Sequence, residues 1–171
     1  MGFSVGDKIL YPNRGAGTIV GKEHEELVDG FEDYYVIEIQ SQRLILRVPV
    51  RMMAELGVRR AISRRRLPRI WETLRSDPQP LPDDFKERQE QIRERLRTGE
   101  PMEIAAAVRD LAWRELHAYL TKADTKLLSQ GRDLLVDEVA LVLDRESVEA
   151  EQLLDKALSV HAEAAAAASA G

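Results

Sequence analysis

Polar and apolar residues alternate through the first 57 residues, and apolar residues then recur at helical spacing along the rest of the chain. The alternation predicts short β-strands, because successive side chains of a strand point to opposite faces. Glycine-containing turns separate the strands, and Asp29-Gly30 is typical of a tight hairpin. The predicted strands cover residues 5–11, 17–22, 34–40 and 43–49. We therefore predict a small, strongly bent antiparallel sheet or an SH3/Tudor-like β-barrel over residues 1–57.

The fourth predicted strand has two faces of different character. One face is aliphatic and is expected to be buried, and it carries Leu44, Leu46 and Val48. The other face is expected to meet solvent, and it carries Arg43, Ile45, Arg47 and Pro49. Basic residues and a closing proline are typical of a strand at the edge of a sheet. An edge strand can pair with a strand of another protein, so this edge is either blocked or used as a protein-binding surface, and the pattern leaves both possibilities open.

The second part of the chain predicts a compact bundle of about five helices over residues 58–160, so the fold class is α+β. A short linking helix is predicted over residues 63–75, a stiff proline-rich linker over 76–82, and the bundle over 83–160. Asp84 is expected to cap the helix that follows the linker, and Gly99 to end it. Residues 161–171 are alanine-rich, and we expect a disordered tail there.

Charge is distributed unevenly along the chain, which has a formal net charge of −5. Residues 1–57 carry a net −3, residues 58–98 a net +5 and residues 99–171 a net −7. An acidic protein binds free DNA poorly, because attraction to phosphate supplies most non-specific affinity. Any nucleic-acid contact is therefore expected in the central basic segment, together with a second anchor on another molecule.

Several classes of chemistry find no support in the sequence. The absence of cysteine excludes disulfides, thiolate nucleophiles and cysteine-bound zinc. The three histidines are scattered, and no HExxH or GxSxG motif occurs. The glycines at positions 15, 17 and 21 match neither a phosphate-binding loop nor a dinucleotide fingerprint. We expect no catalytic residues, no metal and no cofactor.

The chain also lacks an apolar run of the ~20 residues needed to span a membrane, and it begins without a signal-peptide pattern. We expect a soluble, monomeric protein of the cytoplasm that makes no membrane contact.

Five segments, taken in order, resemble the CarD/CdnL family of bacterial transcription regulators: GDKILYPNRGAG, RVPV, LGVR, LRTGEPMEIAAAVRDLAW and LLVDEVALVL. The resemblance covers the chain from Phe3 to about Leu158. It implies a Tudor-like domain, shared with transcription-repair coupling factor, that docks on the β subunit of RNA polymerase. It also implies a helical domain that contacts the upstream edge of the promoter bubble and stabilises the open complex. The expected location is the bacterial cytoplasm or nucleoid.

The same resemblance implies roles for individual residues. Arg47 and Pro49 fall where the family places polymerase-contacting residues, and Arg43 and Ile45 share their strand face. The family wedges a tryptophan of the first helical turn after the linker into a minor-groove step, and this chain has Phe85 there. Lys86 and Arg88 are the basic residues expected to meet DNA beside it, while Glu87 and Glu90 repel phosphate. The expected contact with promoter DNA is therefore weak and depends on tethering to polymerase.

Two alternatives remain open at this point. The chain could bind polymerase without a productive DNA wedge, or it could be a Tudor-like adaptor for a different protein, with the helical half as a second interaction surface.

Overall fold

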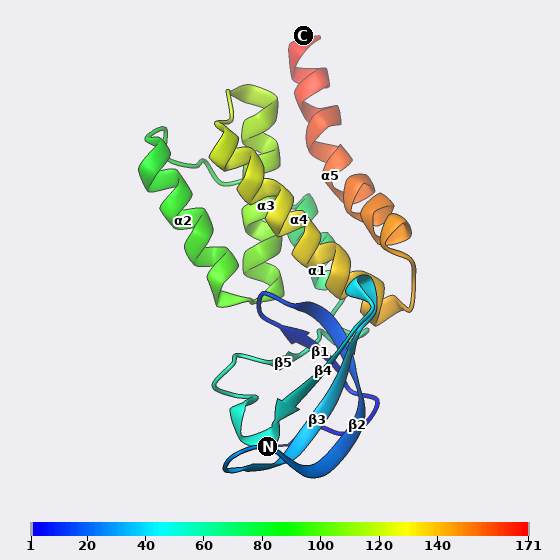
Figure 1. Ribbon diagram of the computed structural model, residues 1–171. Helices are drawn as coiled ribbons and strands as arrows, with labels where there is room; N and C mark the ends of the chain where they lie inside the picture. Colours follow the sequence, from blue (N-terminus) through cyan, green and yellow to red (C-terminus); the bar gives the residue numbers. More distant parts are fainter. Residues whose placement is uncertain (1, 171) are drawn as a thin grey trace. The chain divides into compact units, whose positions relative to one another are not determined.

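The structure is a computed structural model that describes residues 2–170, and the chain forms two compact units (Figure 1). The sheet domain comprises Met1–Ile62 together with Leu141–Asp144, and the helical domain comprises Ser63–Ala140 together with Arg145–Gly171. The predicted α+β fold class is confirmed, since an antiparallel sheet precedes five helices.

The sheet domain holds an open, five-stranded antiparallel sheet with the strand order β4-β3-β2-β1-β5. Because β4 and β5 are the two ends of this order, the bent-sheet form of the prediction is correct and the closed-barrel form is not. Short 3₁₀ turns at Gln40–Gln42 and Val50–Met52 flank β4. The strands are β1 (Lys8–Tyr11), β2 (Gly15–Val28), β3 (Phe31–Ile39), β4 (Leu44–Pro49) and β5 (Arg59–Arg60).

The hairpin of β2 and β3 is longer than the alternation predicts. The predicted strands end at residue 22 and begin again at residue 34, but in the structure both strands continue through the acidic stretch between them as far as the Asp29-Gly30 turn. A cross-strand ion pair supports this extension, because His24 Nδ1 lies 2.9 Å from Asp33 Oδ1. That hydrogen bond raises the pKa of His24 and lowers the pKa of Asp33. The polar extension was missed because it has no apolar face to produce a strand-like pattern.

One face of the sheet carries the core of this domain. Ile9, Ile19, Ile37 and Ile39 are fully buried there, and Met53 and Val58 pack on them from the segment after β4. Tyr35 joins the same cluster, and its hydroxyl hydrogen-bonds the backbone of Phe3. Because this face of the sheet is buried, the side chains that point to the opposite face of each strand are the ones that can reach solvent.

Gly17 permits a close approach between β2 and β3. A Cβ at this position would lie 2.9 Å from the carbonyl oxygen of Glu38 and 2.7 Å from Ile39 Cδ1. We expect Gly17→Ala to lower the free energy of unfolding by about 1–3 kcal/mol through overpacking. Gly21→Ala is the matched control, since a Cβ there would meet Val36 at an ordinary 3.7 Å. Urea denaturation of both variants checks the prediction, and equal stabilities would contradict it.

The helical domain contains the five helices that the periodicity predicts (Figure 1). Asp84 caps α2 as expected, since its carboxylate accepts a hydrogen bond of 2.9 Å from the Glu87 backbone N–H. Gly99 ends that helix in the left-handed conformation, with φ 71°. The helices are α1 (Pro68–Arg75), α2 (Phe85–Thr98), α3 (Pro101–His117), α4 (Lys122–Leu143) and α5 (Ser147–Ser169).

The alanine-rich end of the chain differs from its prediction. Helix α5 continues to Ser169, so residues 161–169 are helical and not disordered. His161 anchors the start of this stretch, because its ring is buried and its Nε2 lies 2.7 Å from the carbonyl oxygen of Leu74. Alanine has the highest helix propensity, so the remaining turns extend an anchored helix at little cost.

No helix in the described part of the chain is both long and apolar enough to cross a membrane. Within the same residues, no group of three or more histidine and carboxylate side chains is placed to hold a metal ion.

Candidate functional site

The first candidate surface is the outer face of β4, the edge strand. Val48 is buried and Leu44 and Leu46 are partly buried against the core, while Ile45 is 59% exposed. The predicted alternation is thus confirmed within the strand. Arg47 lies on the exposed face with Ile45, and Pro49 ends the strand in a half-buried position.

Arg43 does not belong to this strand. It follows the 3₁₀ turn in a left-handed conformation with φ 50°, and β4 begins at the next residue. Its side chain is exposed, so Arg43 lies at the entrance to the edge and outside the strand's alternation. The sequence placed it on the strand because the alternating pattern continues one residue too far.

Arg47 is held across the sheet by an ion pair. Its Nε donates to Glu23 Oε2 at 2.7 Å, and its Nη2 lies 3.4 Å from Glu23 Oε1. Glu23 belongs to β2, so the arginine side chain passes over β3, where Val36 is its partner in register. Both side chains of the pair are partly exposed, and exposed pairs add little to stability. The contact therefore orients the guanidinium without burying it.

The second candidate surface is the start of α2. Phe85 is the first residue of the helix, directly after the cap, and 50% of its surface is exposed. Lys86 is exposed beside it, and its Nζ lies 6.0 Å from the centroid of the Phe85 ring. An exposed aromatic ring at a rigid helix terminus can contact a flat apolar partner, because little conformational entropy remains to be lost.

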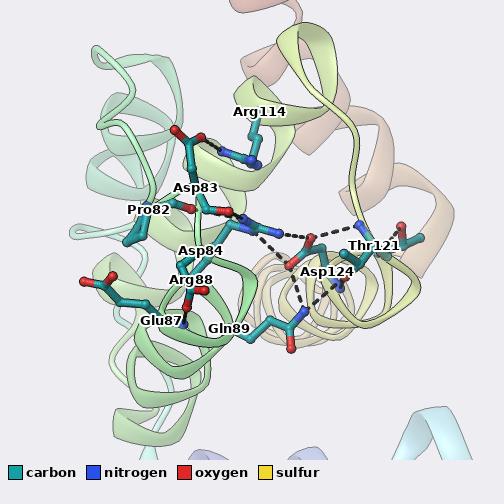
Figure 2. A network of polar contacts seen from close by, with 10 residues as sticks. Pro82, Asp83, Asp84, Glu87, Arg88, Gln89, Arg114, Thr121 and Asp124 are labelled. Carbon is teal, nitrogen blue, oxygen red and sulfur yellow. Dashed lines mark hydrogen bonds and ion pairs between the residues drawn. The ribbon is translucent and has the colours of Figure 1, made fainter.

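Arg88, the third residue predicted to meet DNA, is buried. It is only 2% exposed, and its Nε and Nη2 bind the carboxylate of Asp124 at 3.2 and 2.8 Å (Figure 2). Its Nη1 donates to the carbonyl oxygens of Pro82 and Asp83 at 3.0 and 2.9 Å. With these donors directed into the protein, Arg88 acts as a structural residue. Its burial removes it from the exposed residues predicted to meet DNA.

Asp124 is the centre of this polar network. It is fully buried and also accepts a hydrogen bond of 2.9 Å from the Thr121 backbone N–H, while the Thr121 hydroxyl accepts one from Asp124 N (Figure 2). Gln89 Nε2 donates to the Thr121 hydroxyl at 3.1 Å. Burial by itself would raise the pKa of Asp124, but the hydrogen bonds from Arg88 and Thr121 outweigh it and lower that pKa to about 2. The network therefore joins α2 to the start of α4 with a charged pair.

A second buried carboxylate fixes the proline-rich segment. Asp110 of α3 is buried and accepts a hydrogen bond of 2.9 Å from the backbone N–H of Gln79. Its oxygens also lie 2.8 Å from Arg95 Nη1 and 2.8 Å from Arg109 Nε. Leu81 is buried as well. Residues 76–82 are thus attached to the helical domain, so Phe85 begins at a fixed position and not at the end of a free spacer.

The carboxylates Asp110 and Asp124 were missed in the sequence. The Thr121-x-x-Asp124 spacing is a recognisable local signal for a helix start. The partner of Asp124 is 36 residues away in the chain, and no local pattern identifies it. One sequence feature could have indicated a buried partner for Asp124. Helix α2 has few apolar residues to pack against the domain, so a buried arginine such as Arg88 could complete its packed face.

Two protein-family models match this chain, one in each of its two compact units. The model of the CarD-like/TRCF RID domain matches residues 3–62, and the model of the CarD C-terminal domain matches residues 69–155. The chain is also similar to the Bacillus subtilis (strain 168) protein named "Putative transcription factor YdeB", with 26% identity over 140 residues. That alignment covers 82% of this chain and 92% of the relative. Together the two matches cover most of the chain, and the chain belongs to the CarD family.

Proposed function

We propose that this chain is a non-enzymatic regulator of transcription initiation. In this proposal, the sheet domain docks on the β subunit of RNA polymerase through the outer face of β4. The helical domain then contacts promoter DNA through the start of α2 and stabilises the open complex.

The observation that carries the proposal is the exposed edge strand of the domain that matches the CarD-like/TRCF RID model. Ile45 offers exposed apolar surface there, and Arg47 offers a guanidinium already oriented by Glu23. An arginine beside an aliphatic side chain on an open sheet edge suits a protein partner, since strand addition and an arginine anchor can act together. Pro49 limits further pairing at the end of the strand.

The DNA contact is assigned to Phe85 and Lys86, with Arg88 excluded by its burial. Phenylalanine can act as an apolar wedge at a base step, and Lys86 can meet the neighbouring phosphate. Docking through the sheet domain would keep the helical domain near DNA at an effective concentration of about 1 mM. Such tethering explains how an acidic chain with few basic contacts can act on a promoter.

The test of this proposal uses the full chain and two readouts. The first is its affinity for the isolated polymerase β lobe, measured by calorimetry. The second is the lifetime of promoter open complexes formed by the cognate holoenzyme, with and without the chain. Binding together with a longer lifetime supports the proposal, and absence of binding to the lobe would reject it.

A second candidate function is polymerase binding without a DNA wedge, and the burial of Arg88 favours it. Only Lys86 remains as an exposed cation in the first turn, next to Glu87 and Glu90. Loss of a basic contact weakens the attraction that would hold Phe85 at DNA.

Phe85→Ala separates the two candidates. We expect this variant to shorten the open-complex lifetime by about tenfold, the effect of losing one aromatic contact with a base. The fold is expected to persist, because Phe85 is half exposed and alanine is a good helix former. Val148→Ala, at an exposed apolar position of α5, is the matched control. A lifetime equal to that of the wild type, with unchanged affinity for the β lobe, would favour the second candidate.

A further inference from the structure

The loop between α3 and α4 presents an aromatic side chain that the packing of the domain does not use. Tyr119 lies two residues after α3 ends and is 81% exposed, more than any other large apolar side chain that the structure describes as exposed. Exposing a whole tyrosine ring on a loop contributes nothing to the fold. Most of its surface is therefore available to a flat partner.

The polar network places this loop at the same end of the helical domain as Phe85. Thr121, two residues after Tyr119, is joined to Gln89 of α2 at 3.1 Å, and Asp124 is joined to Arg88 (Figure 2). On the other side of the loop, Arg114 Nη1 lies 3.3 Å from the Asp83 carboxylate. Both ends of the loop are therefore attached to the segment that precedes and starts α2. The two exposed aromatic residues share a rigid support.

The charge of this loop differs from that of the domain around it. Residues 99–171 carry a net −7, yet between Glu115 and Asp133 the sequence contains one carboxylate, Asp124. That carboxylate is buried and paired with Arg88, so it adds no repulsion at the surface. Lys122 and Lys126 are both exposed and are four residues apart on α4, which places them on one helix face. An exposed ring followed by two lysines is a combination that suits single-stranded nucleic acid.

We propose that Tyr119, Lys122 and Lys126 form a second DNA contact, in which Tyr119 stacks on an unpaired base of the promoter bubble and the lysines meet the adjoining phosphates. This inference rests on the proposed function, because tethering to polymerase supplies the DNA. The partner is an unpaired base because a stacked duplex presents base edges, whereas a melted strand presents base faces. In this arrangement Phe85 and Tyr119 contact the same DNA at two points.

The first experiment measures open-complex lifetime with the cognate holoenzyme and a promoter fragment that carries a preformed mismatch bubble. We expect Tyr119→Ala to shorten the lifetime by about 5- to 30-fold, in the range for loss of a stacked aromatic residue. Tyr119→Phe is expected to stay within about twofold of the wild type, because the stacking face is retained. Val148→Ala again serves as the control for removing an exposed apolar side chain.

The second experiment tests the two lysines by salt dependence. Affinity of the full chain for the holoenzyme–bubble complex is measured over a series of salt concentrations. Lys122→Gln with Lys126→Gln is expected to reduce the slope of log affinity against log salt by about 1.4, since each contact with a single strand contributes ~0.7. A merely structural role of these lysines would leave the slope unchanged.

The outcomes separate this inference from the proposed function. If Phe85→Ala shortens the lifetime while Tyr119→Ala and the lysine variant do not, the second contact is overturned and the proposed function stands. If neither aromatic variant has an effect although the wild type lengthens the lifetime, both DNA contacts are overturned. If the wild type fails to bind polymerase, the proposed function and this inference fail together. The inference is supported if Tyr119→Ala shortens the lifetime, Tyr119→Phe retains it, and the lysine variant reduces the slope of log affinity against log salt.

Discussion

Replacing Arg88 with alanine will lower the free energy of unfolding of this chain by about 3–5 kcal/mol, the cost of leaving one member of a buried ion pair without its partner. Asp124 is fully buried, and in this variant it would lose the bidentate guanidinium contact at 2.8 and 3.2 Å. The carbonyl oxygens of Pro82 and Asp83 would lose their donor as well. Chemical denaturation followed by circular dichroism measures the change.

Arg97→Ala is the matched control for this prediction. Arg97 belongs to the same helix and pairs with Glu94, but both side chains are exposed, so the stability should not change measurably. A further variant, Arg88→Met with Asp124→Leu, should recover part of the lost stability, because an apolar pair of similar volume removes the unpaired buried charge. The recovery is expected to be incomplete, since the Thr121 N–H and the carbonyl oxygens of Pro82 and Asp83 still lose their partners. Equal effects of Arg88→Ala and Arg97→Ala would contradict the structural role of Arg88.

The same ion pair makes stability depend on pH in a definite direction. The pKa of Asp124 is about 2 in the folded chain, whereas an unfolded aspartate titrates near 3.9. A carboxylate whose folded pKa is lowered stabilises the fold above its unfolded pKa. That contribution, about 2–3 kcal/mol, is lost as the pH falls from about 4 toward 2. The acid-induced loss should become smaller in the Arg88→Met, Asp124→Leu variant, since the titrating group is absent.

The features that the sequence predicts well in this chain are those decided within a few residues. The cap at Asp84, the helix end at Gly99 and the exposed positions of Ile45 and Arg47 each follow from a local pattern. The predicted limits of the β2–β3 hairpin were wrong, because its outer part is polar and gives no apolar alternation, although cross-strand contacts such as His24–Asp33 are made there. The helical end of α5 was missed for a related reason, since its anchor His161 packs against a carbonyl 87 residues earlier.

The assignment of Arg88 shows why a candidate site is harder to predict than a fold. In sequence, Lys86 and Arg88 are equivalent cations in the first turns of one helix. Helical geometry turns Lys86 outward and Arg88 toward α4, where Asp124 receives it. The long-range pairing with Asp124 decides which of the two cations is exposed at the surface. The same pairing removes a surface carboxylate from the start of α4, and this makes the Tyr119 loop a basic region.

Replacing Arg47 with glutamate will weaken binding to the polymerase β lobe by about 30-fold or more, as for an arginine at the centre of an interface. The expected effect is large because the proposed contact loses its cation and gains an anion on the exposed face of the edge strand. The fold should persist, since Arg47 is exposed and its pair with Glu23 lies at the surface. Calorimetric titration of the whole 171-residue chain with this substitution against the isolated lobe measures the affinity.

Two further variants distinguish a specific contact from a change in net charge. Arg14→Glu makes the same charge change on an exposed turn of the sheet domain and should leave the affinity within about twofold of the wild type, as expected for a charge outside the contact. Glu23→Gln frees Arg47 from the carboxylate that holds it at 2.7 Å in the unbound chain. A polymerase carboxylate would then no longer compete with Glu23, so affinity should be maintained or increased. If Glu23→Gln weakened binding as much as Arg47→Glu, the ion pair itself would be the structure that the partner requires, and Arg47 would act by positioning the edge and not by direct contact.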